Sequence, residues 1–240
     1  MIGIYDYTVI LTYISLLSGC TGTIIAMSGV GHPYIGMFLL LLCGLCDGFD
    51  GRVARTKKDR TNLEKKFGVQ IDSFSDLISF GVLPAAIGMS MLRQNRGLSD
   101  LRGIAEGWLD QATGMSHSNL YRAALILIAL LYILAAMIRL AYFNATEEER
   151  EQEIRENGVA YFTGLPVTSA ALVFPMVLLL HYIPQIDLSI PYFMVMLIMA
   201  MLFVGRFKIR KPGKKGVLVM VAIGLAEFLA FLILTRLTNR

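Results

Sequence analysis

Long apolar stretches, separated by short polar segments, run along most of the chain. Seven of them are long enough, or nearly long enough, for a helix that crosses a bilayer core of about 30 Å. They cover residues 8–30, 34–51, 69–92, 120–143, 163–183, 190–205 and 216–236. The sixth is short and lies between Pro191 and Arg206, so the pattern leaves six to eight spans open. It predicts an all-α fold, a polytopic membrane helical bundle of about seven transmembrane helices.

The composition supports a membrane protein. Hydrophobic residues make up 55% of the 240 residues, charged residues 17%, and the mean hydropathy is +0.61. Soluble domains carry about 25% charged residues, so the composition argues against a soluble globular protein. Disordered chains have low hydrophobicity, so that class is excluded. Three cysteines make no closed disulfide framework. The first residues lack the basic segment of a cleavable signal. We expect one integral-membrane domain over residues 1–240, with no nucleic-acid partner.

Lysine and arginine are concentrated in two of the predicted loops. Residues 52–68 contain seven of them and residues 206–215 contain six. A seven-span topology places both loops on one side of the membrane, together with the acidic segment 145–160. The opposite side holds four arginines: Arg93, Arg96, Arg102 and Arg122. Because cytoplasmic loops are enriched in Lys and Arg, we expect the basic loops and the N-terminus to face the cytoplasm of a cell-membrane protein.

Four aspartates stand at the cytoplasmic ends of the second and third predicted spans. Asp47 and Asp50 are three residues apart, and Asp72 and Asp76 are four apart, so each pair shares one helix face. A hairpin between the two helices can bring these faces together. Carboxylates at membrane depth are costly, and they indicate a functional site. Four converging carboxylates also repel one another unless a cation neutralises them.

Divalent metal is the simplest cation for such a site. An all-oxygen, carboxylate-rich ligand set favours Mg²⁺ or Mn²⁺ over Zn²⁺. Four aspartates can hold two ions about 3.5–4 Å apart, the spacing that clamps phosphoryl oxygens. The alternative is that a single Asp here is an interfacial residue or a helix cap, but burying all four charges makes that interpretation costly.

Small residues recur through the same helix at intervals of three and four: Gly44, Gly48, Gly51 and Ala54. They allow a ligand or another backbone to approach closely. Arg55 follows one turn after Gly51 and offers a planar fork to phosphate. The pair Gly44 and Gly48 alone is also typical of helix packing, so a structural role for those two remains open.

The whole pattern resembles the signature of the CDP-alcohol phosphotransferase family: Asp47-x-x-Asp50-Gly51-x-x-Ala54-Arg55, then Gly68-x-x-x-Asp72-x-x-x-Asp76. Two features depart from it. Twelve residues separate Arg55 from Gly68, where the family usually has about eight. The Pro-Asn pair common in the family's first span is missing, although Thr12 matches the Thr that follows it.

The resemblance implies roles for these residues. The four aspartates would hold two Mg²⁺ or Mn²⁺ ions against the pyrophosphate of a CDP-activated lipid, and Asp76 would also act as general base on an acceptor hydroxyl. Thr12, Gly51, Ala54 and Arg55 would bind the CDP-lipid. A homodimer within the lipid bilayer is also expected from the resemblance.

Two further segments resemble the phosphatidylserine synthase branch of that family. They are Arg139-Leu140-Ala141-Tyr142-Phe143-Asn144 and Tyr161-Phe162-Thr163-Gly164-Leu165-Pro166. The implied reaction transfers a phosphatidyl group from CDP-diacylglycerol to L-serine and releases CMP. Other acceptors, glycerol phosphate or inositol phosphate, and an archaeal ether-lipid donor remain alternatives.

Arg139 is the candidate contact for the acceptor. It is the only Lys or Arg in the inner half of the fourth predicted span, and a buried Arg needs an anionic partner. The single carboxylate of serine supplies one. The alternative is that Arg139 extends to the interface or pairs with a glutamate of the 145–160 segment.

A divalent-metal transporter is the alternative outside enzymes, because transporters also use carboxylates within the membrane. Transporters place their sites near the bilayer midplane, on broken helices. The aspartates here lie instead at one predicted membrane face, beside a basic loop, which favours phosphate chemistry.

Overall fold

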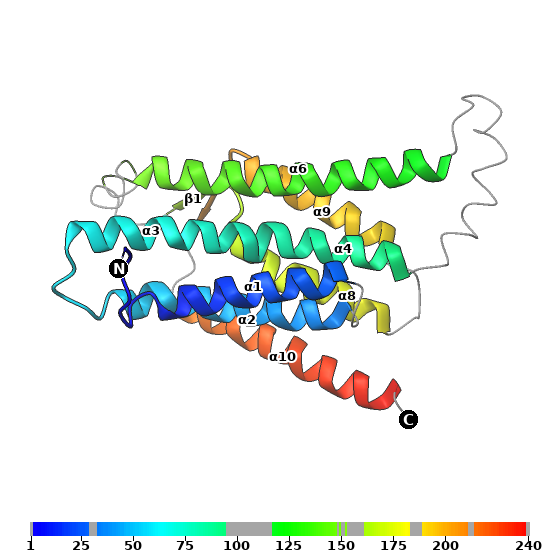
Figure 1. Cartoon of the computed structure of the whole chain (residues 1–240), viewed down its shortest axis with the longest axis horizontal. Coiled ribbons are helices and arrows are strands. Elements are labelled where there is room, and N and C mark those ends of the chain that lie inside the picture. Colours follow the sequence, from blue (N-terminus) through cyan, green and yellow to red (C-terminus); the bar gives the residue numbers. More distant parts are fainter. Residues whose placement is uncertain are drawn as a thin grey trace.

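The computed structural model describes residues 2–28, 33–94, 117–147, 149, 152, 161–182, 189–210 and 214–238. The expected outer loop with Arg96 and Arg102, and most of the acidic segment 145–160, lie outside these residues. The described helices run roughly along one common axis (Figure 1). The described chain begins beside the start of α3 and ends at the opposite end of the bundle, as an odd number of spans requires.

The elements of the described chain, in order, are α1 (Ile10–Ser28), α2 (Pro33–Ala54), α3 (Asn62–Asp76), the π-helix η1 (Leu77–Val82), α4 (Leu83–Gln94), α6 (His117–Ala145), β1 (Tyr161–Thr163), the 3₁₀-helix η2 (Val167–Ser169), α8 (Ala170–Tyr182), α9 (Ser189–Val204), β2 (Lys208–Arg210) and α10 (Lys214–Thr238). A helix covers all or most of each of the seven predicted spans within these residues. The predicted helical membrane bundle is therefore confirmed.

Three helical stretches among the described residues are long and apolar enough to cross a membrane: Ile10–Ser28, Asn62–Leu92 and Tyr121–Ala145. Shorter apolar helices occupy Val167–Leu180, Ser189–Val204 and Val219–Ile233. Long and short helices alike carry large apolar side chains on their outer faces: Leu17 of α1 is 66% exposed, Met194 of α9 59% and Ile233 of α10 60%. Large apolar side chains in such positions are favourable in lipid and unfavourable in water.

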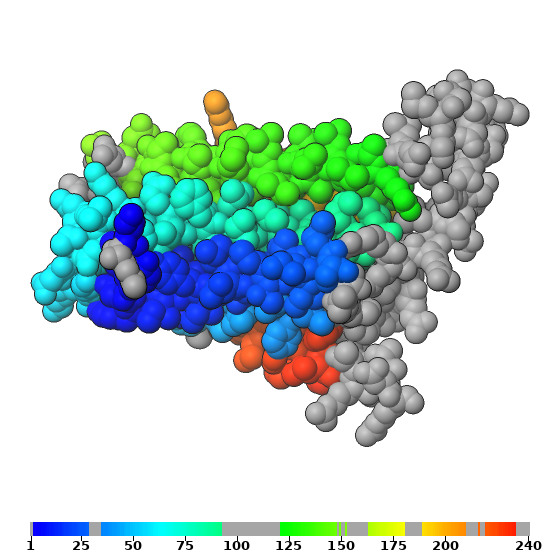
Figure 2. Space-filling model, in the orientation of Figure 1, coloured from blue at the N-terminus to red at the C-terminus, as the bar shows by residue number. Residues whose placement is uncertain are grey.

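On one face of the bundle, α1, α3 with α4, and α6 form adjacent bands (Figure 2). Behind α3 and α4, a cluster of buried aromatic rings joins α6, α8 and α9. Tyr132, Phe174, Tyr192 and Phe203 are each at most 1% exposed, and the rings of Tyr132 and Phe174 meet edge to face at 5.5 Å. This cluster fixes α6 against α8 and α9.

The sequence predicted a fifth span over residues 163–183, and the predicted start of this span is wrong. The helix α8 begins only at Ala170, and the residues before it form β1, which pairs antiparallel with β2. Gly164 ends the strand with φ +77°, where a Cβ would lie 2.9 Å from the carbonyl oxygens of Phe203 and Gly205. Pro166 then follows in extended conformation. The short two-stranded sheet adds to the helical bundle without changing its class.

The long basic hairpin between α2 and α3 is ordered by polar contacts. Thr61 caps α3 in a capping box with Glu64. Lys57 lies 2.8 Å from Asp6 and 2.5 Å from Glu64, so it joins the hairpin to the segment before α1. Hydrogen bonds from Lys57 and from Thr8 lower the pKa of Asp6 to about 2. The extra hairpin residues thus extend the loop while α2 and α3 stay aligned.

Gly44 and Gly48 should respond in opposite ways to substitution by alanine. A Cβ on Gly44 would lie 2.5 Å from the Cβ of Ala171, whereas nothing lies within 4 Å of one on Gly48. We expect Gly44→Ala to lower the free energy of unfolding by about 1–3 kcal/mol through overpacking. Gly48→Ala should leave it unchanged or raise it by up to about 1 kcal/mol through helix propensity. Unfolding in detergent, followed by circular dichroism, measures both, and equal stabilities would contradict this packing.

Candidate active site

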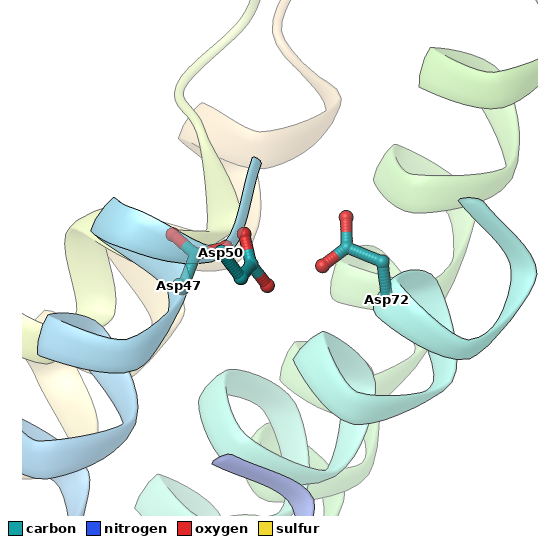
Figure 3. Close-up of side chains that lie close together, drawn as sticks. All are labelled: Asp47, Asp50 and Asp72. Carbon is teal, nitrogen blue, oxygen red and sulfur yellow. The ribbon is translucent and has the colours of Figure 1, made fainter. Parts of the chain in front are cut away.

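Two helices bring the four aspartates together. Asp47 and Asp50 lie in the last two turns of α2, and Asp72 and Asp76 in the second half of α3. Single carboxylate oxygens of Asp47, Asp50 and Asp72 all lie within 4.8 Å of one another. Figure 3 shows them directed into the space between α2 and α3. Asp76 lies one turn further along α3 and is outside this group of three.

The four carboxylates are partly or almost fully withdrawn from water, and no Lys or Arg of the described chain forms an ion pair with them. Asp50 and Asp76 are each 8% exposed, and Asp47 and Asp72 are half-buried. In the described residues, the ion pairs join Lys57 to Asp6 and to Glu64, and no Lys or Arg pairs with the four aspartates. Mutual repulsion in such a place is relieved by a bound cation or by protons. The donor set of carboxylate oxygens fits a hard divalent metal.

The first helix supports this cluster from its side. The Thr12 hydroxyl donates to Oδ2 of Asp50 at 3.2 Å, so Thr12, a predicted ligand contact, contacts a carboxylate of the cluster. The Ser75 hydroxyl, next to Asp76, donates to the Thr12 carbonyl at 3.2 Å. Ser79 donates in the same way to the Ser15 carbonyl at 3.3 Å. Sequence reasoning missed the serines, although their spacing of four places them on one face of a helix.

The small residues of α2 divide into two groups. Gly44 packs against Ala171 of α8, which is the helix-packing role that the sequence left open. Gly48 faces open space, and Gly51 has only the Arg55 guanidinium nearby, 3.8 Å from where a Cβ would stand. Gly51 and Arg55 are exposed, and Ala54 is half-buried. The surface of α2 beside the aspartates is therefore open to a phosphate group, with a guanidinium at its edge.

Arg139 lies on α6 and is buried, with 5% exposure. Its Nε donates to the carbonyl of Leu165 at 3.2 Å, and its guanidinium carbon lies 5.5 Å from the centre of the Phe143 ring. None of these contacts is to the four aspartates. The link from α6 to the site comes instead from Asn144, whose Nδ2 donates to Oγ of Ser73 at 2.8 Å, beside Asp72. Asn144 was not among the predicted site residues. It ends the segment that begins at Arg139 and resembles the phosphatidylserine synthase branch, and that resemblance was the signal that could have identified it.

The geometry limits the chemistry that this site can perform. Carboxylates from two helices provide oxygen ligands for a divalent cation, and the open glycine surface beside them has room for a phosphate, with a guanidinium at its edge. A metal-bound phosphate is an electrophile, and a nearby carboxylate can accept a proton. The arrangement suits transfer of a phosphoryl group to a hydroxyl.

Curated proteins similar to the chain are named for such transfers. A CDP-diacylglycerol–serine O-phosphatidyltransferase of Saccharomyces cerevisiae is 30% identical over 68% of this chain and 51% of its own length. One of Mycobacterium bovis is 28% identical over 66% of this chain and 44% of its own. An archaetidylserine synthase of Methanothermobacter thermautotrophicus is 31% identical over 66% of this chain and 53% of its own.

The chain thus spans about half the length of the curated relatives it matches. No solved structure matches it. The family model described as CDP-alcohol phosphatidyltransferase matches residues 8–206, which include α1 through α9 and all four aspartates. The chain belongs to the CDP-alcohol phosphatidyltransferase family.

Proposed function

We propose that the protein is a membrane-bound CDP-diacylglycerol–serine O-phosphatidyltransferase, which transfers a phosphatidyl group to L-serine and releases CMP. The observation that carries the proposal is the meeting of Asp47, Asp50 and Asp72 between α2 and α3. The names of the relatives support the choice of substrates. We also propose that residues 1–240 act as one domain in the cell membrane and form a homodimer.

Asp47, Asp50, Asp72 and Asp76 are proposed to hold two Mg²⁺ or Mn²⁺ ions. Such ions neutralise and orient the pyrophosphate of the CDP-lipid when bound. Gly51 and Ala54 let the diphosphate approach α2, and Arg55 binds it from the edge of the site. Thr12 acts here by holding Asp50, since its hydroxyl already donates to that carboxylate.

Asp76 is the proposed general base. It is the most deeply placed aspartate along α3 and is held on both sides, by Ser75 and Ser79, against α1. Its carboxylate takes the proton of the acceptor hydroxyl as that oxygen forms a bond to the lipid-side phosphorus. The bond from this phosphorus to the bridging oxygen breaks, and the electron pair leaves with CMP.

Arg139 is proposed to bind the carboxylate of serine. Its burial supports an anionic partner and favours that role over a side chain extended to the interface. Glycerol phosphate or inositol phosphate would bring about two charges to the same cation, so serine is the better match. The archaetidylserine synthase relative keeps an ether-lipid donor open.

The site is proposed to face the cytoplasm, where soluble serine and a membrane lipid can meet. The cations of the basic hairpin follow Asp50 directly along the chain, and cytoplasmic loops are enriched in such residues. A metal transporter would place its carboxylates near the middle of its spans. Asp47 and Asp50 stand in the last two turns of α2, which favours the transferase.

The function is tested by CMP release from CDP-diacylglycerol with serine, glycerol phosphate and inositol phosphate in parallel. We expect release with serine that requires Mg²⁺ or Mn²⁺ and stops when a chelator is added, because four carboxylates without an ion pair need the metal to bind a diphosphate. Release with another acceptor alone would reject serine. Full activity in chelator would reject the metal mechanism.

Replacing Asp76 by Asn should abolish turnover while the protein still inserts and folds. Loss of a general base alone costs about 10²–10⁴-fold in rate, and loss of a metal ligand adds to it. Asp59→Asn is the matched control, because Asp59 is an exposed aspartate of the hairpin and its replacement should leave the rate unchanged. A near-normal rate for Asp76→Asn would remove Asp76 from both roles.

Arg139→Ala should raise the apparent KM for serine about ten- to hundred-fold, and that for CDP-diacylglycerol much less. Arg139→Lys should recover part of the loss, because a point charge replaces a bidentate fork. Arg122→Ala, on an exposed position of the same helix, is the control and should change neither constant. If only the KM for CDP-diacylglycerol rises, Arg139 binds the diphosphate instead.

A further inference from the structure

The helix that carries Asp72 and Asp76 changes its hydrogen-bond pattern directly after Asp76. Residues Leu77–Val82 form a π-helix within an otherwise continuous helical stretch that runs from Asn62 to Leu92. The amide of Leu83 donates to the carbonyl of Ile78, five residues back rather than four. A π-helical turn inside an α-helix is rare and needs a local cause, and such turns are frequent at functional sites.

Pro84 supplies that cause. In a regular α-helix the carbonyl of Phe80 would accept a hydrogen bond from the amide of residue 84, and proline has no amide hydrogen. Phe80 is fully buried, with 0% exposure, so water cannot replace the missing donor. A buried carbonyl without its donor is costly, and the protein must satisfy it from another element.

Tyr132 provides the replacement donor. Its hydroxyl, on α6, donates to the carbonyl oxygen of Phe80 at 2.6 Å, and its ring is fully buried against Phe174 and Phe203. Those ring contacts fix the hydroxyl in place. The hydrogen bond therefore joins α6 to the turn that begins one residue after Asp76.

The π-helical turn changes the directions in which the side chains before it point relative to those after it. It places one extra residue in the turn, which rotates the helix before it by about 100° relative to the helix after it. Before and within the turn, Ser75 and Ser79 bond to carbonyls of α1. Beyond it, the buried side chains of Leu83 and Ile87 pack around Gly22 and Gly36. The turn lets Asp76 face the acidic cluster while α4 keeps its own packing.

We propose that Tyr132 is a positioning residue, which holds the turn at Phe80 and so directs the carboxylate of Asp76 into the four-aspartate site. This rests on the proposed function only in that Asp76 serves the site as metal ligand and base. Tyr132 touches neither substrate nor metal in this account. It acts through the backbone of the helix that carries Asp76.

Tyr192 offers a matched control. It is also fully buried, and its hydroxyl also donates to a backbone carbonyl of the same helical stretch, that of Pro84, at 2.9 Å. Its ring belongs to the same aromatic cluster. Removing either hydroxyl costs one buried hydrogen bond. Of the two, the Tyr132 hydroxyl donates to a carbonyl within the π-helical turn, whereas the Tyr192 hydroxyl donates to one just beyond it.

The test measures Mn²⁺ binding and CMP release for the purified full chain carrying Tyr132→Phe or Tyr192→Phe. We expect Tyr132→Phe to weaken Mn²⁺ binding about tenfold or more, as loss of support for a metal ligand typically does, and to lower kcat. The control should stay within twofold of the wild type in both. Mn²⁺ affinity within twofold of the wild type in Tyr132→Phe, or an equal loss in Tyr192→Phe, would overturn the proposal.

A second pair of variants tests the role of Pro84. In the Pro84→Ala background an amide hydrogen is available to the Phe80 carbonyl, so adding Tyr132→Phe should change Mn²⁺ affinity less than twofold. A tenfold loss there would overturn the proposal. This comparison also replaces the first if Tyr132→Phe alone does not fold.

The two proposals fail in distinguishable ways. Weakened Mn²⁺ binding in Tyr132→Phe, with no CMP release from the wild type, would keep the positioning role and reject the transferase. Normal CMP release from the wild type, with unchanged Mn²⁺ affinity in Tyr132→Phe, would keep the transferase and reject the positioning role.

Discussion

Repulsion among carboxylates that meet between two packed helices is the constraint on which the rest of the structure depends. Asp47, Asp50 and Asp72 converge on one point, and Asp50 and Asp76 are almost completely withdrawn from water. Like charges in a medium of low dielectric constant separate or lose their charge unless a cation joins them. The protein prevents separation with helix packing. Hydrogen bonds from Thr12 and Ser75 fasten α1 to both aspartate helices, and the Gly44–Ala171 contact fastens α2 to α8.

The same packing leaves one side of the site open. Gly48 has free space above it and Gly51 only a guanidinium, so the face of α2 that carries Asp47 and Asp50 is also the face that a diphosphate can reach. The polar contacts also differ between the packed sides and the open side of the site. The Thr12 hydroxyl of α1 and the Asn144 amide of α6 donate hydrogen bonds on the packed sides, to Asp50 and to Ser73. The cations of the hairpin stand at the open end. The proposed function, in which one site binds a charged headgroup and a lipid tail together, needs this asymmetry.

Much of this could be predicted from the sequence, because its strongest signals are local. The three- and four-residue spacings place each aspartate pair on one face, and apolar stretches predict helices that the structure contains. Contacts between distant elements could not be predicted. The strand at Tyr161–Thr163 depends on pairing with residues 208–210, and the role of Tyr132 depends on a proline 48 positions away in the chain. The contact of Arg139 with Leu165 could not be predicted for the same reason, because it too joins distant parts of the chain.

The most direct measurement of the central claim is the number of Mn²⁺ ions bound by the purified chain, counted by electron paramagnetic resonance with CDP-diacylglycerol present. The account predicts two ions per chain that sense each other magnetically, since a clamp on a diphosphate holds them about 3.5–4 Å apart. Replacing both Asp47 and Asp72 by asparagine should abolish this binding. Two-ion binding that persists in that double variant, or no binding by the wild type, would contradict the account.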